Sequence, residues 1–214
     1  MKKVILYCCV ALLAIQHSPL YSKIEINENL LSRISEQYGQ DAYKRIIKWQ
    51  ALLEAQQSEP IDEQLKEIND FFNRLDFIDD KKHWGKEDYW ATPIEFLSTS
   101  GGDCEDFTIA KYFSLVELGV DKSKLRLMYV TATKPPQAHM VLAYYENPNS
   151  IPLVLDNLNK RILPASQRKD LLPIYSFNGD GLWLAKTQGR GRMMQNRGNN
   201  SLWDELNERM KNGF

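Results

Sequence analysis

The chain has 214 residues and a formal net charge of -1, with 27 lysine and arginine residues against 28 aspartate and glutamate residues. This length suits one domain with a sizeable core and is too short for two large ones. The balanced charge gives no indication of a nucleic-acid or membrane-binding surface.

The first residues have the organisation of a secretory signal. Met1 to Lys3 is basic, and Val4 to Ile15 is a continuous apolar run. Such a run is short for a bilayer span and typical of a signal peptide, which we expect to cover residues 1–22. The cleavage site is weakly marked, with Ser18 or Ser22 as its possible end, and an uncleaved N-terminal anchor is the alternative.

The positions of the three cysteines bear on whether the protein has a reactive thiol. Cys8 and Cys9 lie inside the apolar run and would leave with it, so the mature chain keeps Cys104 alone and forms no internal disulfide. A single unpaired cysteine in an exported protein indicates a reactive thiol. The alternative is a buried cysteine that acts as a small apolar side chain.

Residues 23–80 are predicted to be helical. Glu28 to Gln57 has apolar residues at steps of three and four, which predicts one long helix or two helices broken near Gly39. Pro60 interrupts the pattern, and a further helix is predicted over Ile61 to Phe77.

The polar and aromatic run Asp79 to Thr92 has no steady period, so we predict a loop followed by a short helix over Pro93 to Leu97. Trp84, Tyr89 and Trp90 in this loop either form a wall of a cleft or pack the loop onto the core.

The stretch that follows predicts a cysteine at the start of a helix. Gly101 and Gly102 allow a sharp turn, Asp103 is a suitable N-cap, and the helix continues from Cys104 to a stop at Gly119. A thiolate at a helix N-terminus is stabilised by the helix dipole, so we expect the pKa of Cys104 to lie below the free value of about 8.5.

Beyond Gly119 the apolar period changes from helical to two, which predicts strands. Turn residues between these segments predict two antiparallel hairpins, and the last amphipathic segment predicts a terminal helix. The segments are Leu125 to Ala132, Ala138 to Tyr145, Ile151 to Asp156, Pro173 to Phe177, Leu182 to Ala185, and the helical Leu202 to Met210.

The first hairpin places two polar residues on one face. With a turn centred on Pro148 and Asn149, His139 and Asp156 lie opposite one another or one diagonal step apart. Together with Cys104 they would form a nucleophile, base and orienting carboxylate suited to acyl transfer. A structural role for His139 is the alternative reading.

Three carboxylates surround the cysteine: Asp103, Glu105 and Asp106. Their charges would oppose thiolate formation, which favours a bound hard cation such as Ca²⁺. The equally supported alternative is that Asp103 caps the helix while Glu105 and Asp106 complement its dipole.

The run GGDCEDF, followed by AHMVL and LVLDNL, resembles the bacterial transglutaminase-like cysteine proteinases. The resemblance implies an α+β fold of papain or transglutaminase type, in which N-terminal helices pack with a central cysteine-bearing helix against an antiparallel sheet. It implies Cys104 as nucleophile, His139 as general base and Asp156 as orienting residue. It also implies a calcium site at Asp103, Glu105 and Asp106, within a single domain over residues 23–214 (helical region 23–80, core 81–187, tail 188–214).

The resemblance further implies a function: a periplasmic, calcium-dependent endopeptidase that cleaves the N-terminal region of a large cell-surface adhesin and promotes biofilm dispersal. A cyclic di-GMP-responsive inner-membrane receptor would be its inhibitory partner. We expect no nucleic acid as a partner, and we do not expect this chain to be an integral membrane protein itself. The alternatives are a transglutaminase- or amidase-type acyl transferase, and a non-catalytic peptide-binding module.

Overall fold

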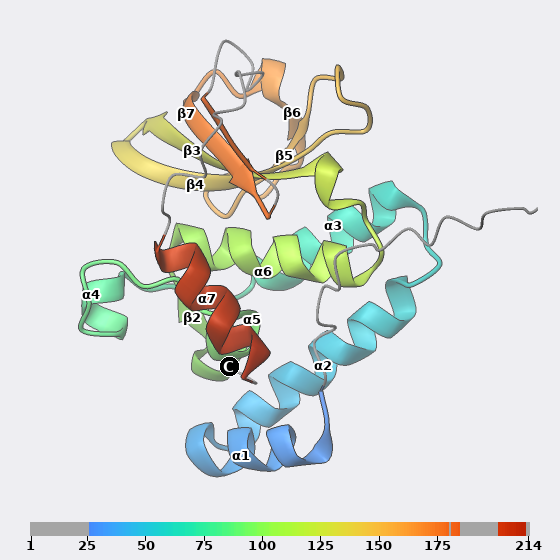
Figure 1. Cartoon of the computed structure of the whole chain (residues 1–214), viewed down its shortest axis with the longest axis vertical. Coiled ribbons are helices and arrows are strands. Elements are labelled where there is room, and N and C mark those ends of the chain that lie inside the picture. The colour runs from blue at the N-terminus through green and yellow to red at the C-terminus, as the bar shows by residue number, and fades with distance from the viewer. Residues whose placement is uncertain (1–25, 180, 185–200, 213–214) are drawn as a thin grey trace, which may run out of the picture.

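The structure is a computed structural model that describes residues 26–179, 181–184 and 201–212. The predicted signal peptide, residues 1–22, and residues 188–200 of the tail lie outside the described residues. None of the described helices is long and apolar enough to cross a membrane. The described helices are α1 Glu28–Tyr38, α2 Gln40–Gln56, α3 Ile61–Phe72, α4 Asp80–His83, α5 Pro93–Thr99, α6 Cys104–Glu117 and α7 Ser201–Lys211 (Figure 1).

A six-stranded antiparallel sheet forms the other half of the fold, with the order β6-β5-β4-β3-β7-β8. Both predicted hairpins are present in it, as β4 with β5 and as β7 with β8. The strands are β3 Leu125–Thr133, β4 Pro136–Tyr144, β5 Leu153–Leu155, β6 Leu163–Pro164, β7 Leu171–Asn178 and β8 Gly181–Leu184. The expected α+β fold with an antiparallel sheet is therefore confirmed.

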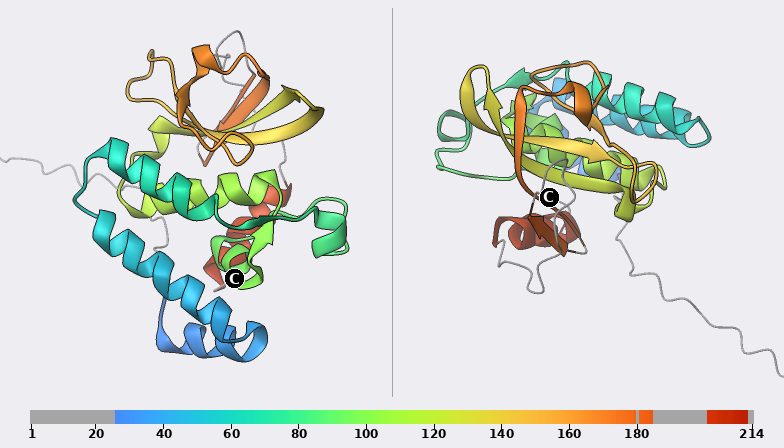
Figure 2. Two further views of the ribbon diagram at one scale, coloured as in Figure 1. Left: turned by 180° about the vertical axis from the view of Figure 1, so that it is seen from behind. Right: turned by 90° about the horizontal axis from the view of Figure 1, so that it is seen from above.

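Helix α6 lies at the centre, between the sheet and the helices α2, α3 and α5 (Figures 1 and 2). Every residue from Asp106 to Leu115 is buried. A helix that is covered on all sides needs apolar residues around its whole circumference, and most residues of this stretch are apolar. Its first residue, Cys104, is thereby fixed to the rigid centre of the molecule.

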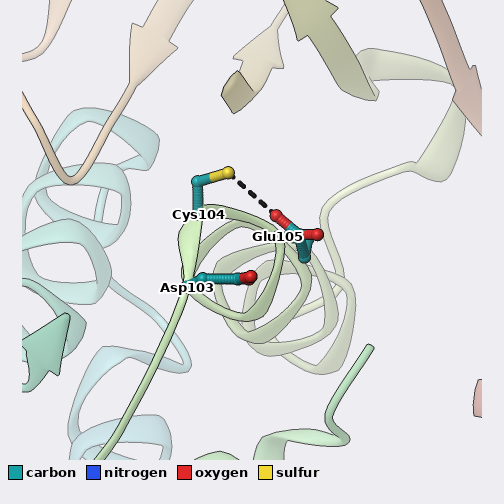
Figure 3. A group of neighbouring side chains, drawn as sticks. All are labelled: Asp103, Cys104 and Glu105. Carbon is teal, nitrogen blue, oxygen red and sulfur yellow. Dashed lines mark hydrogen bonds between the residues drawn. The ribbon is translucent and has the colours of Figure 1, made fainter. Parts of the chain in front are cut away.

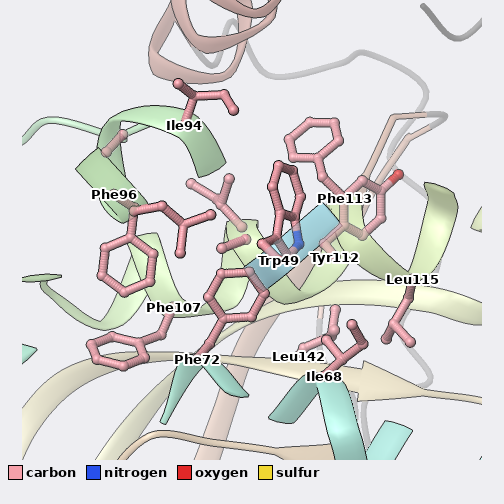
Figure 4. Packing of buried hydrophobic residues seen from close by; sticks show 14 of the residues in the cluster. Trp49, Ile68, Phe72, Ile94, Phe96, Phe107, Tyr112, Phe113, Leu115 and Leu142 are labelled. Atoms are coloured by element: carbon pink, nitrogen blue, oxygen red, sulfur yellow. The ribbon is translucent and has the colours of Figure 1, made fainter. Parts of the chain in front are cut away.

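Aromatic side chains fill the space between α6 and the N-terminal helices (Figure 4). Phe72 stacks on Phe96, and Phe96 meets Phe107 edge to face. The indole of Trp49 donates a hydrogen bond of 2.9 Å to Ser114 on α6, so the buried polar groups of both residues are satisfied.

The helical region differs from the prediction at its end. The break at Gly39 is present, with φ at 84°, and separates α1 from α2. However, α3 ends at Phe72 rather than Phe77, because the chain pairs in a short parallel ladder of β1 (Asp76–Phe77) with β2 (Gly101–Gly102). The predicted loop after residue 79 also contains the short helix α4.

Candidate active site and acidic cluster

The start of α6 is positioned by the β1–β2 ladder. The turn before it uses Ser100 in the left-handed region, with φ at 67°, whereas neither Gly101 nor Gly102 has a positive φ. A Cβ on Gly101 would lie 2.6 Å from the Asp76 carbonyl oxygen, and one on Gly102 would overlap the carboxylate of Asp106. The glycines are thus required for close packing and not for the conformational freedom that we expected.

The Asp106 side chain joins the first turn of α6 to the residue that precedes the helix and to the segment before α5. Its Oδ2 accepts from the backbone N–H of Asp103 at 3.2 Å, and its Oδ1 accepts from that of Ala91 at 2.7 Å. The residue is fully buried, and burial raises its pKa well above the ordinary value. Asp106 therefore caps the first turn from within the helix, whereas the alternative reading of the sequence assigned the cap to Asp103 and only a dipole role to Asp106. Asp106 is also one of the candidate metal ligands.

The thiol of Cys104 contacts the neighbouring carboxylate. Its Sγ lies 2.8 Å from Oε2 of Glu105 (Figure 3). Burial raises the pKa of Cys104 well above the ordinary value, and the charge and hydrogen bond of Glu105 raise it further, while a backbone hydrogen bond from Met140 acts in the opposite direction. The expected low pKa is therefore wrong for the protein chain by itself, because burial and like charges outweigh the helix dipole.

His139 and Asp156 are brought together as the hairpin register predicted. Leu142 pairs with Leu155, so Asp156 lies across from Val141 and one diagonal step from His139. Both side chains are buried, and His139 Nε2 lies 2.8 Å from Asp156 Oδ1. Burial opposes ionisation of Asp156, but His139 and then Arg168 outweigh it and lower its pKa to about 2.

The first turns of α6 dock on strand β4 beside His139. The hydroxyl of Thr108 lies within hydrogen-bond distance of two carbonyl oxygens, those of Cys104 at 2.9 Å and of Met140 at 3.0 Å. Met140 follows His139 directly, so this contact fixes the helix start against the main chain of β4 one residue from His139. Within the described part of the chain, no hydrogen bond joins the cysteine sulfur to His139.

The acidic cluster is larger than the sequence indicated. The carboxylates of Asp80, Asp103 and Asp106 lie within 4.8 Å of one another, as do those of Asp80, Asp88 and Glu105. Asp80 and Asp88 come from the polar run before α5, whose aromatic residues alone were candidates for the site. The sequence shows that both residues are acidic, but only the fold shows that they belong to the same cluster as Asp103 and Glu105.

Two oxygens of this cluster, Asp80 Oδ1 and Asp103 Oδ1, are buried and make no hydrogen bond. Burial raises the pKa of Asp80 to about 6 and, together with Glu105 and Asp106, that of Asp103 to about 10. Buried oxygens without a partner are costly, and several convergent carboxylates match the hard-oxygen ligand set of Ca²⁺. The residues present therefore fit a calcium ion.

Comparison with solved structures gives close relatives. The EGTA-treated form of LapG from Legionella pneumophila is 43% identical with a TM-score of 0.75, over 86% of this chain and 98% of that chain. The calcium-bound form is 42% identical with a TM-score of 0.73, over 86% of this chain and 99% of that one. No curated protein matches the chain.

A family model described as bacterial transglutaminase-like cysteine proteinase matches residues 40–170. This range contains every residue of the candidate site, from Asp80 to Asp156. The match spans more than half of the chain, and the identity to LapG extends over most of it. The chain belongs to the bacterial transglutaminase-like cysteine proteinases.

Proposed function

We propose that this protein is a calcium-dependent cysteine endopeptidase with Cys104 as nucleophile, His139 as general base and Asp156 as orienting residue. The observation that carries the proposal is the buried His139–Asp156 pair, held beside the helix start that bears Cys104. An ionised carboxylate only accepts hydrogen bonds, so Asp156 requires the proton of a neutral imidazole to be on Nε2. The lone pair of His139 is then on Nδ1, which is the proposed base atom.

The proposed reaction is acyl transfer to water. His139 takes the thiol proton, the Cys104 sulfur attacks the peptide carbonyl, and the imidazolium returns the proton to the leaving amine. Water, deprotonated by the same imidazole, then hydrolyses the thioester. Before attack, the thiol exchanges its contact with Glu105 for one with His139.

The calcium part of the proposal is supported by the two unpartnered buried oxygens and by the calcium-bound form of LapG. Asp80 and Asp103 would hold the ion, with Glu105, Asp106 and Asp88 of the overlapping groups as further ligands. A bound Ca²⁺ supplies positive charge that offsets these carboxylates. Glu105 is the member of the cluster that also contacts the thiol, so its placement links the two sites.

The proposed substrate is the periplasm-exposed N-terminal region of a large surface adhesin, with release of the adhesin promoting biofilm dispersal. An inner-membrane receptor responsive to cyclic di-GMP is the proposed inhibitory partner. The apolar segment at residues 4–15 supports export to the periplasm. The proposed substrate, the proposed receptor and the periplasmic location rest on the family resemblance.

The test is to incubate the mature protein, residues 23–214, with the N-terminal region of an adhesin from the same cell and to map new N-termini. Cys104→Ala is expected to lower turnover by about a thousandfold or more while leaving the fold intact. Cleavage that survives this substitution would refute the proposal. Amine-coupled products without cleavage would instead establish the acyl transferase, and binding without turnover by either protein would establish a peptide-binding module.

A further inference from the structure

Arg168 is a buried cation close to the candidate catalytic residues. It follows the short 3-10 helix Ala165–Gln167 and precedes β7, and its side chain is almost wholly buried. Its Nη2 lies 2.7 Å from Oδ2 of Asp156 and 2.8 Å from Oδ2 of Asp170, and its Nε lies 3.0 Å from Oδ1 of Asp170. The segment that follows Asp156, which includes β6, thus brings the Arg168 guanidinium back to the Asp156 carboxylate.

These contacts determine the orientation of the Asp156 carboxylate. Oδ1 accepts from His139 and from the backbone N–H of Leu158 at 2.9 Å, which leaves Oδ2 for Arg168. Asp170 accepts hydrogen bonds from two nitrogens of the guanidinium and so fixes the plane of that group. The carboxylate has no freedom to turn away from the imidazole while Arg168 is in place.

The backbone of Asp156 is held separately. The amide of Asn73, at the end of α3, donates to the Asp156 carbonyl at 2.8 Å, and buried Lys111 of α6 donates to the same amide group of Asn73 at 2.8 Å. Since the main chain is secured in this way, loss of Arg168 is expected to free the side chain of Asp156 without displacing its strand.

We propose that Arg168 is a positioning residue for catalysis, which holds the Asp156 carboxylate directed at His139. This inference rests on the proposed function of the site. Arg168 touches neither the sulfur nor the site of substrate attack, so its effect passes through Asp156 and then the imidazole. Partners that orient metal-binding side chains change affinity or activity by about 10- to 100-fold when removed, and we expect a loss of the same size for a partner that orients Asp156.

The kinetic test uses two variants. Arg168→Met keeps much of the side-chain length and removes the charge, and Arg168→Lys keeps the charge and removes the planar guanidinium. The value of kcat is expected to fall about 10- to 100-fold in Arg168→Met and less in Arg168→Lys, with KM within about twofold of wild type. Lys169→Met, an exposed neighbour that loses the same charge, is the matched control and should behave as wild type.

A second readout does not depend on activity. The Nε2–H proton of His139, assigned with His139→Gln, reports its hydrogen bond to Asp156 in NMR spectra. We expect this signal to be shifted or lost in Arg168→Met and kept in Lys169→Met. Circular dichroism melting establishes which variants are folded at the assay temperature. If Arg168→Met does not fold, Asp170→Asn is the substitute variant. It weakens the contact that holds the guanidinium, and we expect it to lower kcat by a smaller factor.

The inference is overturned if a folded Arg168→Met keeps wild-type kcat, or if its Nε2–H signal is unchanged. Recovery of kcat in Arg168→Ala by added guanidinium ion would support it, and failure of that ion to restore any activity would count against it. A wild-type protein without peptidase activity would refute the proposed function, whereas the NMR comparison would still decide whether Arg168 orients Asp156.

Discussion

Glu105 connects the two chemical parts of the site at the scale of single residues. Its carboxylate contacts the Cys104 thiol and also lies within 4.8 Å of the carboxylates of Asp80 and Asp88. A cation held by these carboxylates would compete with the thiol for Glu105. Calcium dependence in this protein would then arise from release of the nucleophile as well as from stabilisation of the turn.

Calcium is expected to raise the thermal stability of the wild-type protein, since a ligand that binds only the folded state stabilises it by mass action. Addition of EGTA to the calcium-loaded protein should lower the melting temperature and abolish peptidase activity. Asp80→Asn should weaken both responses, whereas Asp76→Asn, an exposed acid nearby, should retain them. An equal melting temperature with calcium and with EGTA in the wild type would refute the site.

At the scale of secondary-structure elements, α6 carries both the candidate nucleophile and a brace for the candidate orienting residue. Lys111 lies two turns after Cys104 and reaches Asn73 at the end of α3, which in turn holds the backbone of Asp156. The two ends of the proposed triad are thus tied to the same helix. Burial lowers the pKa of Lys111 from its ordinary value of 10.5 to about 7, while Asp156 acts in the opposite direction.

This lowered pKa predicts a pH dependence of folding stability. Between pH 7 and 10.5 the unfolded chain holds the Lys111 proton and the folded chain does not, so stability rises with pH in this window. Below pH 7 both states hold the proton and the cost of the buried charge is present in full. From pH 6 to pH 9 the wild type should gain about 2 to 3 kcal/mol relative to Lys111→Met, whose residue cannot titrate.

Urea unfolding of the two proteins at both pH values measures this difference. Contributions from other titrating groups cancel in the comparison where they are independent of Lys111. The same stability difference between the two proteins at pH 6 and pH 9 would contradict a neutral Lys111 in the folded state at alkaline pH.

At the scale of the whole molecule, the C-terminal helix α7 supports the acidic cluster from outside. Trp203 stacks on Phe113 of α6 and meets Trp90 edge to face. Arg209 lies over the ring of Tyr89 and donates to the carbonyl of Trp90. The chain segment held in this way donates backbone hydrogen bonds to Asp80 and Asp106, so α7 and the cluster are mechanically linked.

Trp203→Ala is expected to destabilise the protein by about 3 kcal/mol, because a large aromatic side chain is removed from a packed cluster. The loss should appear in urea unfolding, and limited proteolysis should cut α7 sooner. Glu205→Ala, an exposed substitution on the same helix, is the control. If both variants unfold at the same urea concentration, α7 does not stabilise the core in the way described.

Local features of the fold could be read from the chain alone. The helix that starts at Cys104, the hairpin that aligns His139 with Asp156 and the strands of period two depend on residues close together in sequence, and the structure contains them. Periodicity, caps and turns encode such elements because they act over a few residues.

Contacts between distant segments required the tertiary structure. Asp80 joins Asp103, and Arg168 returns to Asp156, only after α6 has packed between the helices and the sheet. The high pKa of Cys104 likewise depends on burial, which no local pattern reports. Short-range preferences thus specified which side chains lie on which element, whereas packing decided which charges meet and how far each is removed from water.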